Sequence, residues 1–194
     1  MESKKIYAVT GGIGSGKSEV LRILSSLGYP TLSCDEIYKN LLNESKTIEK
    51  LSVAFPSCVS GGKLDKQKLS SIVFADNEKL SLLNSLTHPL ILERLFALAN
   101  EESSKLVFAE VPLYFESKLE KYFSGAVVVT RNLGDRISSV ITRSGLTESQ
   151  VKERISRQTD YDNLDLSNYI VIKNNGDIHS LTNAVKTALS TIIE

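Results

Sequence analysis

Five short apolar runs along the chain alternate with longer stretches in which apolar residues recur at helical spacing. The runs cover residues 6–10, 30–34, 106–110, 126–130 and 169–173. Runs of this length and composition are typical of strands that are buried on both faces of a parallel sheet. Helical patterns between successive strands favour an α/β fold. We therefore predict a five-stranded parallel sheet with helices between its strands.

The last helical pattern is the clearest of the chain. Its apolar positions share one helix face and are Ile178, Leu181, Val185, Ala188, Leu189 and Ile192. Asp177 precedes them and is placed to cap the helix, because a carboxylate there accepts hydrogen bonds from the first free backbone N–H groups.

Two stretches are longer than the roughly twelve residues that a crossover between parallel strands needs. Residues 36–104 carry leucines at helical spacing and a Ser60-Gly61-Gly62 turn, which predicts a helical insertion. Residues 131–165 are polar and rich in arginine. Such a segment forms either a solvated surface or the mobile lid that phosphate-transfer enzymes often carry. The predicted domains are a core of residues 1–35, 105–130 and 166–194, a helical substrate domain of residues 36–104 and a lid of residues 131–165.

Composition limits the partners of the protein. The 194 residues, 41% of them hydrophobic, are enough for one substantial core with a small insertion. Acidic and basic residues number 23 each, so no basic field favours nucleic acid, and no apolar stretch is long enough to cross a bilayer. Cys34 and Cys58 lack metal-ligand spacing and fit a reduced, cytoplasmic compartment.

Residues 11–18 read Gly-Gly-Ile-Gly-Ser-Gly-Lys-Ser and match the phosphate-binding pattern G-x-x-x-x-G-K-[ST] between a predicted strand and a predicted helix. Glycines let the backbone turn tightly and aim its N–H groups at phosphate oxygens, aided by the positive end of the helix. Lys17 places a charge on the β- and γ-phosphates of a nucleoside triphosphate, and the Ser18 hydroxyl can reach Mg²⁺. The alternative is a glycine-rich turn that merely starts a helix. The predicted nucleotide-binding residues of this loop are Gly12, Ile13, Gly14, Ser15, Gly16, Lys17 and Ser18.

Two carboxylates stand at the ends of predicted strands, where ligands bind in open parallel sheets. Asp35 could accept a proton from an attacking hydroxyl, or it could cap the helix that follows. Glu110 could hold Mg²⁺ through water, although a contact with loop N–H groups is the simpler interpretation.

Other polar and aromatic residues carry weaker signals. His88 precedes Pro89, which restricts its backbone to extended geometry and predicts a break in the helix; a lone histidine is more often structural than catalytic. Tyr114 and Phe115 are expected in the core or lining a groove. A guanidinium over the γ-phosphate would stabilise the transferring group, although each arginine taken singly is more often a solvated residue. The arginines of the predicted lid are Arg131, Arg136, Arg143, Arg154 and Arg157.

Further motifs extend over nearly the whole chain. They are Thr10 with the phosphate loop, Leu27-Gly28, Asp35, His88-Pro89-Leu90-Ile91, Val111-Pro112-Leu113-Tyr114-Phe115-Glu116, Arg143, Arg154 with Gln158, and Asn174-Asn175-Gly176. In this order and combination they resemble the dephospho-coenzyme A (dephospho-CoA) kinase family.

The resemblance implies a P-loop kinase core, a helical domain for the coenzyme A end of the substrate, and an arginine-bearing lid. It implies ATP-dependent phosphorylation of the ribose 3′-hydroxyl of dephospho-CoA to give CoA and ADP, with ATP and Mg²⁺ as cofactors and a monomer or weak oligomer as the working form. By carry-over, Asp35 is the base, Lys17 and Arg143 act on the phosphates, and Asn175 belongs to the adenine pocket. The residues implied to bind the acceptor substrate are Asp35, His88, Pro112 and Leu113.

The chain departs from the family pattern at several positions. Ser33-Cys34-Asp35 replaces Asp-Ala-Asp, and Glu19 stands where threonine is common. In the lid motif Gln-x-x-Arg-x-x-x-Arg, Arg136 takes the glutamine position and Ser139 the first arginine position. Ser167-Asn168-Tyr169 replaces Ala-Asp-Tyr.

Two alternative functions are compatible with the phosphate loop. One is another nucleoside or nucleotide kinase, and the other is a regulatory switch that holds a nucleoside triphosphate. A GTPase switch carries an Asn-Lys-x-Asp guanine reader, and the nearest match, Asn174-Asn175-Gly176-Asp177, lacks the lysine.

Overall fold

The computed structural model of the protein describes residues 4–193, so residues 1–3 and 194, which end the predicted core ranges, lie outside it. The chain divides into two compact units. The first unit comprises Met1–Leu32 and Glu102–Glu194, and the second comprises Ser33–Glu101.

The first unit is built on a five-stranded sheet with the strand order β2-β5-β1-β6-β7. Its strands are β1 (Lys5–Thr10), β2 (Thr31–Ser33), β5 (Leu106–Glu110), β6 (Gly125–Thr130) and β7 (Ile170–Lys173). β1 pairs in parallel with both β5 and β6, and Ala8 faces Ala109 on one side and Ala126 on the other. Because these central strands are buried on both faces, they show in the sequence as continuous apolar runs. The prediction of a five-stranded parallel sheet is confirmed.

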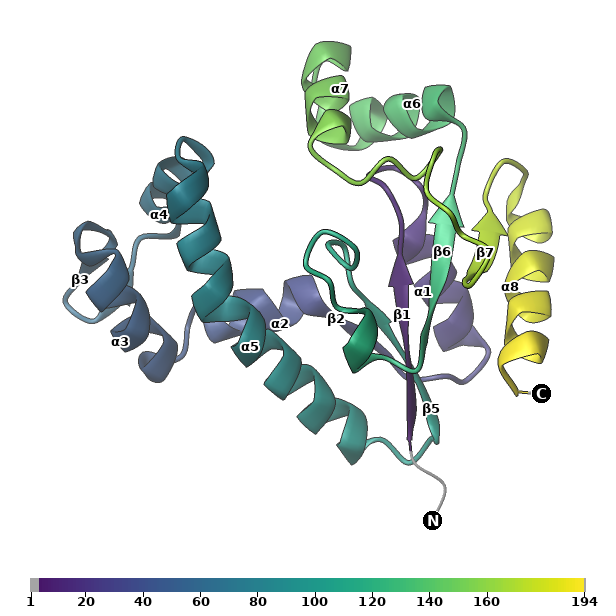
Figure 1. Ribbon diagram of the computed structural model, residues 1–194, viewed down its shortest axis with the longest axis horizontal. Coiled ribbons are helices and arrows are strands. Elements are labelled where there is room, and N and C mark those ends of the chain that lie inside the picture. The colour runs from purple at the N-terminus through teal and green to yellow at the C-terminus, as the bar shows by residue number, and fades with distance from the viewer. Residues whose placement is uncertain (1–3, 194) are drawn as a thin grey trace. The chain divides into compact units, whose positions relative to one another are not determined.

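The helices of the first unit are α1 (Lys17–Ser26), α6 (Leu133–Ser144), α7 (Glu148–Ser156) and α8 (Ile178–Ile193), with a short 3₁₀ turn at Glu120–Tyr122. α1 and α8 share one buried cluster with strands β1, β5, β6 and β7. In Figure 1, α6 and α7 lie beyond the ends to which the arrows of β1 and β6 point. These two helices therefore stand at the carboxyl edge of the sheet, where the phosphate loop also begins.

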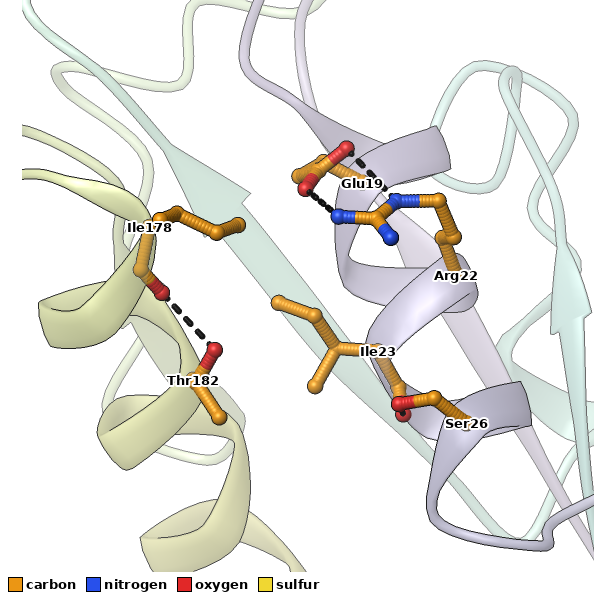
Figure 2. A network of polar contacts seen from close by, with 6 residues as sticks. All are labelled: Glu19, Arg22, Ile23, Ser26, Ile178 and Thr182. Atoms are coloured by element: carbon orange, nitrogen blue, oxygen red, sulfur yellow. Dashed lines mark hydrogen bonds and ion pairs between the residues drawn. The ribbon is translucent and has the colours of Figure 1, made fainter.

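α8 buries five of the six residues of its predicted apolar face, whereas Ile178 at its start is 52% exposed. Ile23 of α1 is buried, and Figure 2 shows its side chain pointing toward Ile178 of α8. On α1, Glu19 and Arg22 form an ion pair one helical turn apart. The predicted cap of α8 is confirmed, because Asp177 Oδ1 accepts a hydrogen bond of 2.8 Å from the backbone N–H of Ser180.

The second unit is helical, as predicted. Its elements are α2 (Cys34–Leu41), α3 (Ser45–Ala54), a 3₁₀ turn at Pro56–Cys58, β3 (Val59–Ser60), β4 (Lys63–Leu64), α4 (Lys66–Phe74) and α5 (Asn77–Glu101). β3 and β4 form an antiparallel hairpin whose turn is Gly61-Gly62, both in the left-handed region (φ 56° and 73°). Within this unit Arg94 pairs with Glu44 at 2.8 Å. Cys34 and Cys58 are both buried and form no disulfide with each other.

The predicted helix break at His88-Pro89 is wrong. α5 runs from Asn77 to Glu101 with Pro89 inside it. A proline in a helix interior costs about 3 kcal/mol, because it removes one backbone hydrogen bond and clashes with the preceding turn. Buried residues flank Pro89 on both sides, with Leu83 before it and Leu95 after it. Burying one such side chain is worth about 1.5–3 kcal/mol, so packing along the whole of α5 outweighs the local penalty.

None of the helices within residues 4–193 combines the length and the apolar character needed to cross a membrane.

Candidate active site

The phosphate loop connects β1 to α1 and depends on glycine at several positions. Gly14 and Gly16 have φ angles of 77° and 98°, a region that other residues rarely adopt. A Cβ on Gly14 would lie 2.5 Å from the carbonyl oxygen of Arg136, and one on Gly16 would lie 2.2 Å from Nδ2 of Asn174. The loop therefore needs glycine both for its turn and for the close approach of its neighbours.

Lys17 begins α1, and its ammonium group reaches back over the loop. Its Nζ donates hydrogen bonds to the carbonyl oxygens of Gly11 (2.8 Å) and Gly12 (3.2 Å). Gly16 forms the N-terminal end of the helix, with its carbonyl accepting from the N–H groups of Glu19 and Val20. A lysine charge and a helix N-terminus at one loop make a site for the phosphates of a nucleotide.

Ser18 and Glu110 meet at the same edge of the sheet. The Ser18 hydroxyl donates a hydrogen bond of 3.3 Å to Oε1 of Glu110, which ends β5. Hydroxyl and carboxylate oxygens are the ligands that Mg²⁺ prefers, and such sites keep several waters and use substrate phosphates for the remaining positions. Within residues 4–193 no three His, Cys, Asp or Glu side chains gather as a complete metal site. The pair therefore fits a cation that is bound together with a nucleotide.

Three side chains form hydrogen bonds with the backbone of the loop, and two of them come from the arginine-rich segment. Arg136 Nε donates to the Ile13 carbonyl (3.1 Å), and Gln158 Oε1 accepts from the Ile13 N–H (2.7 Å). Asn174 Nδ2 donates to the Ser15 carbonyl (2.9 Å). Arg136 is only 4% exposed, so its interpretation as an ordinary solvated residue is wrong.

The sequence offered little to distinguish Arg136 from the other arginines. Its helix neighbours Ile137 and Val140 are apolar and buried, which places that face of α6 inward. By contrast, Arg143 lies exposed in the last turn of α6, and Arg154 lies exposed on α7.

Two tyrosines of the first unit are buried. Tyr161 Oη lies 3.3 Å from Oγ1 of Thr10, the last residue of β1, and burial raises the pKa of Tyr161 to about 12. Tyr114 is 1% exposed and packs edge-on against Phe115 and Tyr169, with its pKa raised to about 12 chiefly by burial. The expectation that Tyr114 belongs to the core is confirmed.

The remaining candidates of the first unit lie in loops after strands. Pro112 and Leu113 lie two and three residues after the end of β5, and Leu113 is 39% exposed. Asn175 follows β7, and its Oδ1 accepts a hydrogen bond of 2.8 Å from the backbone N–H of Asn132, next to α6. Asn175 thus joins two loops at the carboxyl edge of the sheet.

Two candidates belong to the second unit. Asp35 is exposed in the first turn of α2, directly after β2 ends at Ser33. The cap of α2 is Ser33, whose Oγ accepts from the N–H of Glu36 at 3.3 Å, so the interpretation of Asp35 as the helix cap is wrong. His88 is half-buried in α5, and burial lowers the pKa of its imidazole.

Comparison with known proteins places this chain in one family. The family model for dephospho-CoA kinase matches residues 5–180. A dephospho-CoA kinase of Thermus thermophilus is 35% identical over 187 residues, which cover 96% of this chain and 91% of the relative. The crystal structure of a Thermus thermophilus protein has a TM-score of 0.86 at 33% identity and covers 98% of this chain and 99% of its own. A dephospho-CoA kinase from Campylobacter jejuni has a TM-score of 0.68 at 26% identity, with 96% of each chain covered. With its glycine loop, Lys17 and Ser18 at the carboxyl edge of a parallel sheet, the chain is a P-loop kinase and belongs to the dephospho-CoA kinase family.

Proposed function

We propose that this protein transfers the γ-phosphoryl group of ATP to the ribose 3′-hydroxyl of dephospho-CoA, giving CoA and ADP in the last step of CoA biosynthesis. The observation that carries the proposal is the phosphate loop with its lysine in a chain whose family model spans residues 5–180. The relatives named above act as kinases of dephospho-CoA, which supports the same acceptor here.

The triphosphate of ATP binds in the loop from Gly12 to Ser18. Backbone N–H groups and the N-terminus of α1 meet the phosphate oxygens, and Lys17 turns from its loop carbonyls toward the β- and γ-phosphates. Asn175 forms part of the adenine pocket, which its position after β7 supports.

Mg²⁺ accompanies the nucleotide. Ser18, whose hydroxyl lies 3.3 Å from Oε1 of Glu110, would supply an oxygen to the ion, and the Glu110 carboxylate would help to hold it. When bound, the cation would supply positive charge that offsets the charge of the transferring phosphates.

Residues 131–165 act as a lid. Arg143 on α6 reaches the transferring group when the lid closes and stabilises the negative charge spread over its oxygens. The exposure of Arg143 supports this role, since a lid residue has to be free to move onto its ligand.

Residues 36–104 form the substrate domain, and Asp35 at its border is the base. Its carboxylate orients the ribose hydroxyl in line with the γ-phosphate and takes the proton as transfer proceeds. The assignment gains support from Ser33, because a residue other than Asp35 caps α2 and leaves this carboxylate available. His88, Pro112 and Leu113 contact the acceptor.

The working form is a cytoplasmic monomer or weak oligomer. Two cysteines that form no disulfide with each other fit a reducing compartment. Gel filtration with light scattering measures the oligomeric state directly.

A coupled ADP-release assay tests the proposal. ATP and Mg²⁺ are supplied with dephospho-CoA or with each member of a panel of nucleosides and nucleotides. Among these acceptors, we expect only dephospho-CoA to give fast ADP release. ³¹P NMR of the product should show a new 3′-phosphomonoester. A nucleoside that supports faster turnover would show that the protein is another nucleoside kinase. ADP release that is equally fast without any acceptor would identify a regulatory switch.

A further inference from the structure

The backbone of Ile13 is held at both of its polar groups by side chains from the arginine-rich segment. Its N–H donates to Gln158 at 2.7 Å, and its carbonyl accepts from Arg136 at 3.1 Å. Its side chain packs against the apolar cluster of α6 and α7, which includes Val140 and Val151. One residue of the phosphate loop is therefore anchored in three ways to the segment proposed as the lid.

The two anchoring side chains come from opposite ends of that segment. Arg136 lies in the first turns of α6, and Gln158 follows shortly after α7 ends at Ser156. α6 and α7 lie between these two side chains along the chain. The same pair of hydrogen bonds thus links the backbone of the phosphate loop to both ends of the segment proposed as the lid.

Arg136 carries a buried positive charge, and the carboxylate that interacts with it electrostatically is that of Asp160. Arg136 is 4% exposed, and its guanidinium donates to the backbone carbonyl of Ile13. The pKa of Asp160 is lowered mainly by a hydrogen bond from Asn163, and the charge of Arg136 is the smallest of the causes. A buried charge is costly unless it is compensated. A buried guanidinium beside the phosphate loop is therefore suited to compensation by an anionic ligand as well.

The guanidinium of Arg136 lies directly against the phosphate loop. A Cβ added to Gly12 would be 2.2 Å from Nη2 of Arg136, which shows how closely the two approach. Phosphate oxygens bound in the loop would lie in the field of this charge. A charge that is already in place when the ligand arrives costs no reorganisation during the reaction.

We propose that Arg136 and Gln158 are positioning residues that clamp the backbone of Ile13, hold the phosphate loop ready for nucleotide and add a fixed positive charge beside it. This inference rests on the proposed function only where it names dephospho-CoA as the acceptor. Its main test uses nucleotide binding alone, so the two can fail separately.

The test compares four variants by their affinity for a non-hydrolysable ATP analogue with Mg²⁺, measured by calorimetry without acceptor. Arg136→Gln removes the charge and should weaken binding about 10- to 100-fold, as expected for a hydrogen bond from a charged group. Gln158→Leu removes a neutral acceptor and should weaken binding about 2- to 10-fold. The double variant should lie within about twofold of Arg136→Gln, because both side chains act on the same residue.

Lys152→Gln is the matched control, since it removes one positive charge from the same segment. Lys152 is exposed on α7 and pairs with Glu148 at 2.6 Å, so its loss should leave the affinity unchanged. Steady-state kinetics add a second readout. Arg136→Gln and Gln158→Leu should raise the KM for ATP and leave the KM for dephospho-CoA unchanged.

Arg136→Lys keeps the test usable if Arg136→Gln does not fold. It keeps the charge but loses the planar geometry of the guanidinium, and its affinity should lie between those of wild type and Arg136→Gln. Thermal unfolding without nucleotide reports on the fold itself. The proposal is overturned if the folded variants of both residues bind the analogue as well as wild type does, or if the two single effects multiply in the double variant. A wild-type protein that binds the analogue but does not phosphorylate dephospho-CoA would reject the proposed function and leave the clamp to be judged by binding.

Discussion

The substitution Asp35→Asn is expected to lower kcat strongly and to change the stability of the fold only slightly. The substitution keeps the size of the side chain and removes the basic oxygen that would take the proton of the ribose hydroxyl. The structure determines what else is lost. Asp35 is exposed in the first turn of α2, and Ser33 supplies the cap. The chain also carries Ser33 where the family has a second acid, so no neighbouring carboxylate in that position can substitute for Asp35.

The two expected effects differ strongly in size. Loss of a general base lowers kcat by about 10²- to 10⁴-fold. The stability cost comes from the favourable interaction of a carboxylate with the helix N-terminus, which is worth about 0.3–1 kcal/mol at a solvent-exposed position. For a protein of this size, such a loss lowers the unfolding midpoint by only about 1–4 °C.

Ser33→Ala is the matched control two residues away. It removes the hydrogen bond between Ser33 Oγ and the Glu36 N–H, and loss of a serine cap costs about 1 kcal/mol. We expect this variant to be less stable than Asp35→Asn and to keep nearly normal kcat. The assays are ADP release at saturating ATP and dephospho-CoA, calorimetric ATP-analogue affinity, and thermal unfolding. Full turnover by a folded Asp35→Asn protein would refute the assignment of Asp35 as base.

Four further predictions concern the first unit. Lys17→Ala should lower kcat by about 10²- to 10³-fold in the ADP-release assay, and a near-normal kcat would count against the phosphate-loop assignment. Gly14→Ala should abolish measurable binding of the ATP analogue in calorimetry, because its Cβ would meet backbone atoms of Arg136 while φ stays at 77°. The analogue should increase hydrogen-exchange protection between residues 137 and 157, and unchanged exchange with binding confirmed would exclude a lid. Because burial raises the pKa of Tyr114 to about 12, above its unfolded value near 10, the unfolding free energy should fall as pH rises from about 10 to 12. Tyr114→Phe should make this fall shallower in denaturant titrations.

The local pattern of the chain was sufficient to locate the strands of its five-stranded sheet. Buried parallel strands need apolar residues on both faces, so all five strands of the sheet could be placed from the sequence to within one or two residues. The phosphate loop, the Gly61-Gly62 turn and the Asp177 cap are also local, since each depends on residues a few positions apart. The arrangement of loop, Lys17 and Ser18 therefore followed from the sequence alone.

Other features depended on competition that a local pattern does not record. Pro89 disfavours a helix locally, but burial along α5 on both sides of it exceeds the penalty. Ser33 and Asp35 are both good capping residues, and the choice between them depended on α2 beginning at Cys34. Burial along α5 decided the first case, and the position at which α2 begins decided the second.

The side chains that hold the phosphate loop are brought to it by the tertiary structure alone. Arg136, Gln158 and Asn174 reach the loop from more than a hundred residues away in the chain. Their residue types suit solvated surfaces equally well, because arginine, glutamine and asparagine bond to water as readily as to a backbone carbonyl. Only when β6 pairs with β1 and β7 pairs with β6, so that their carboxyl ends lie at the same edge of the sheet, does the backbone of residues 13–15 become the partner of these side chains. The sequence determined the group that binds phosphate, and the fold determined which distant side chains hold that group in place.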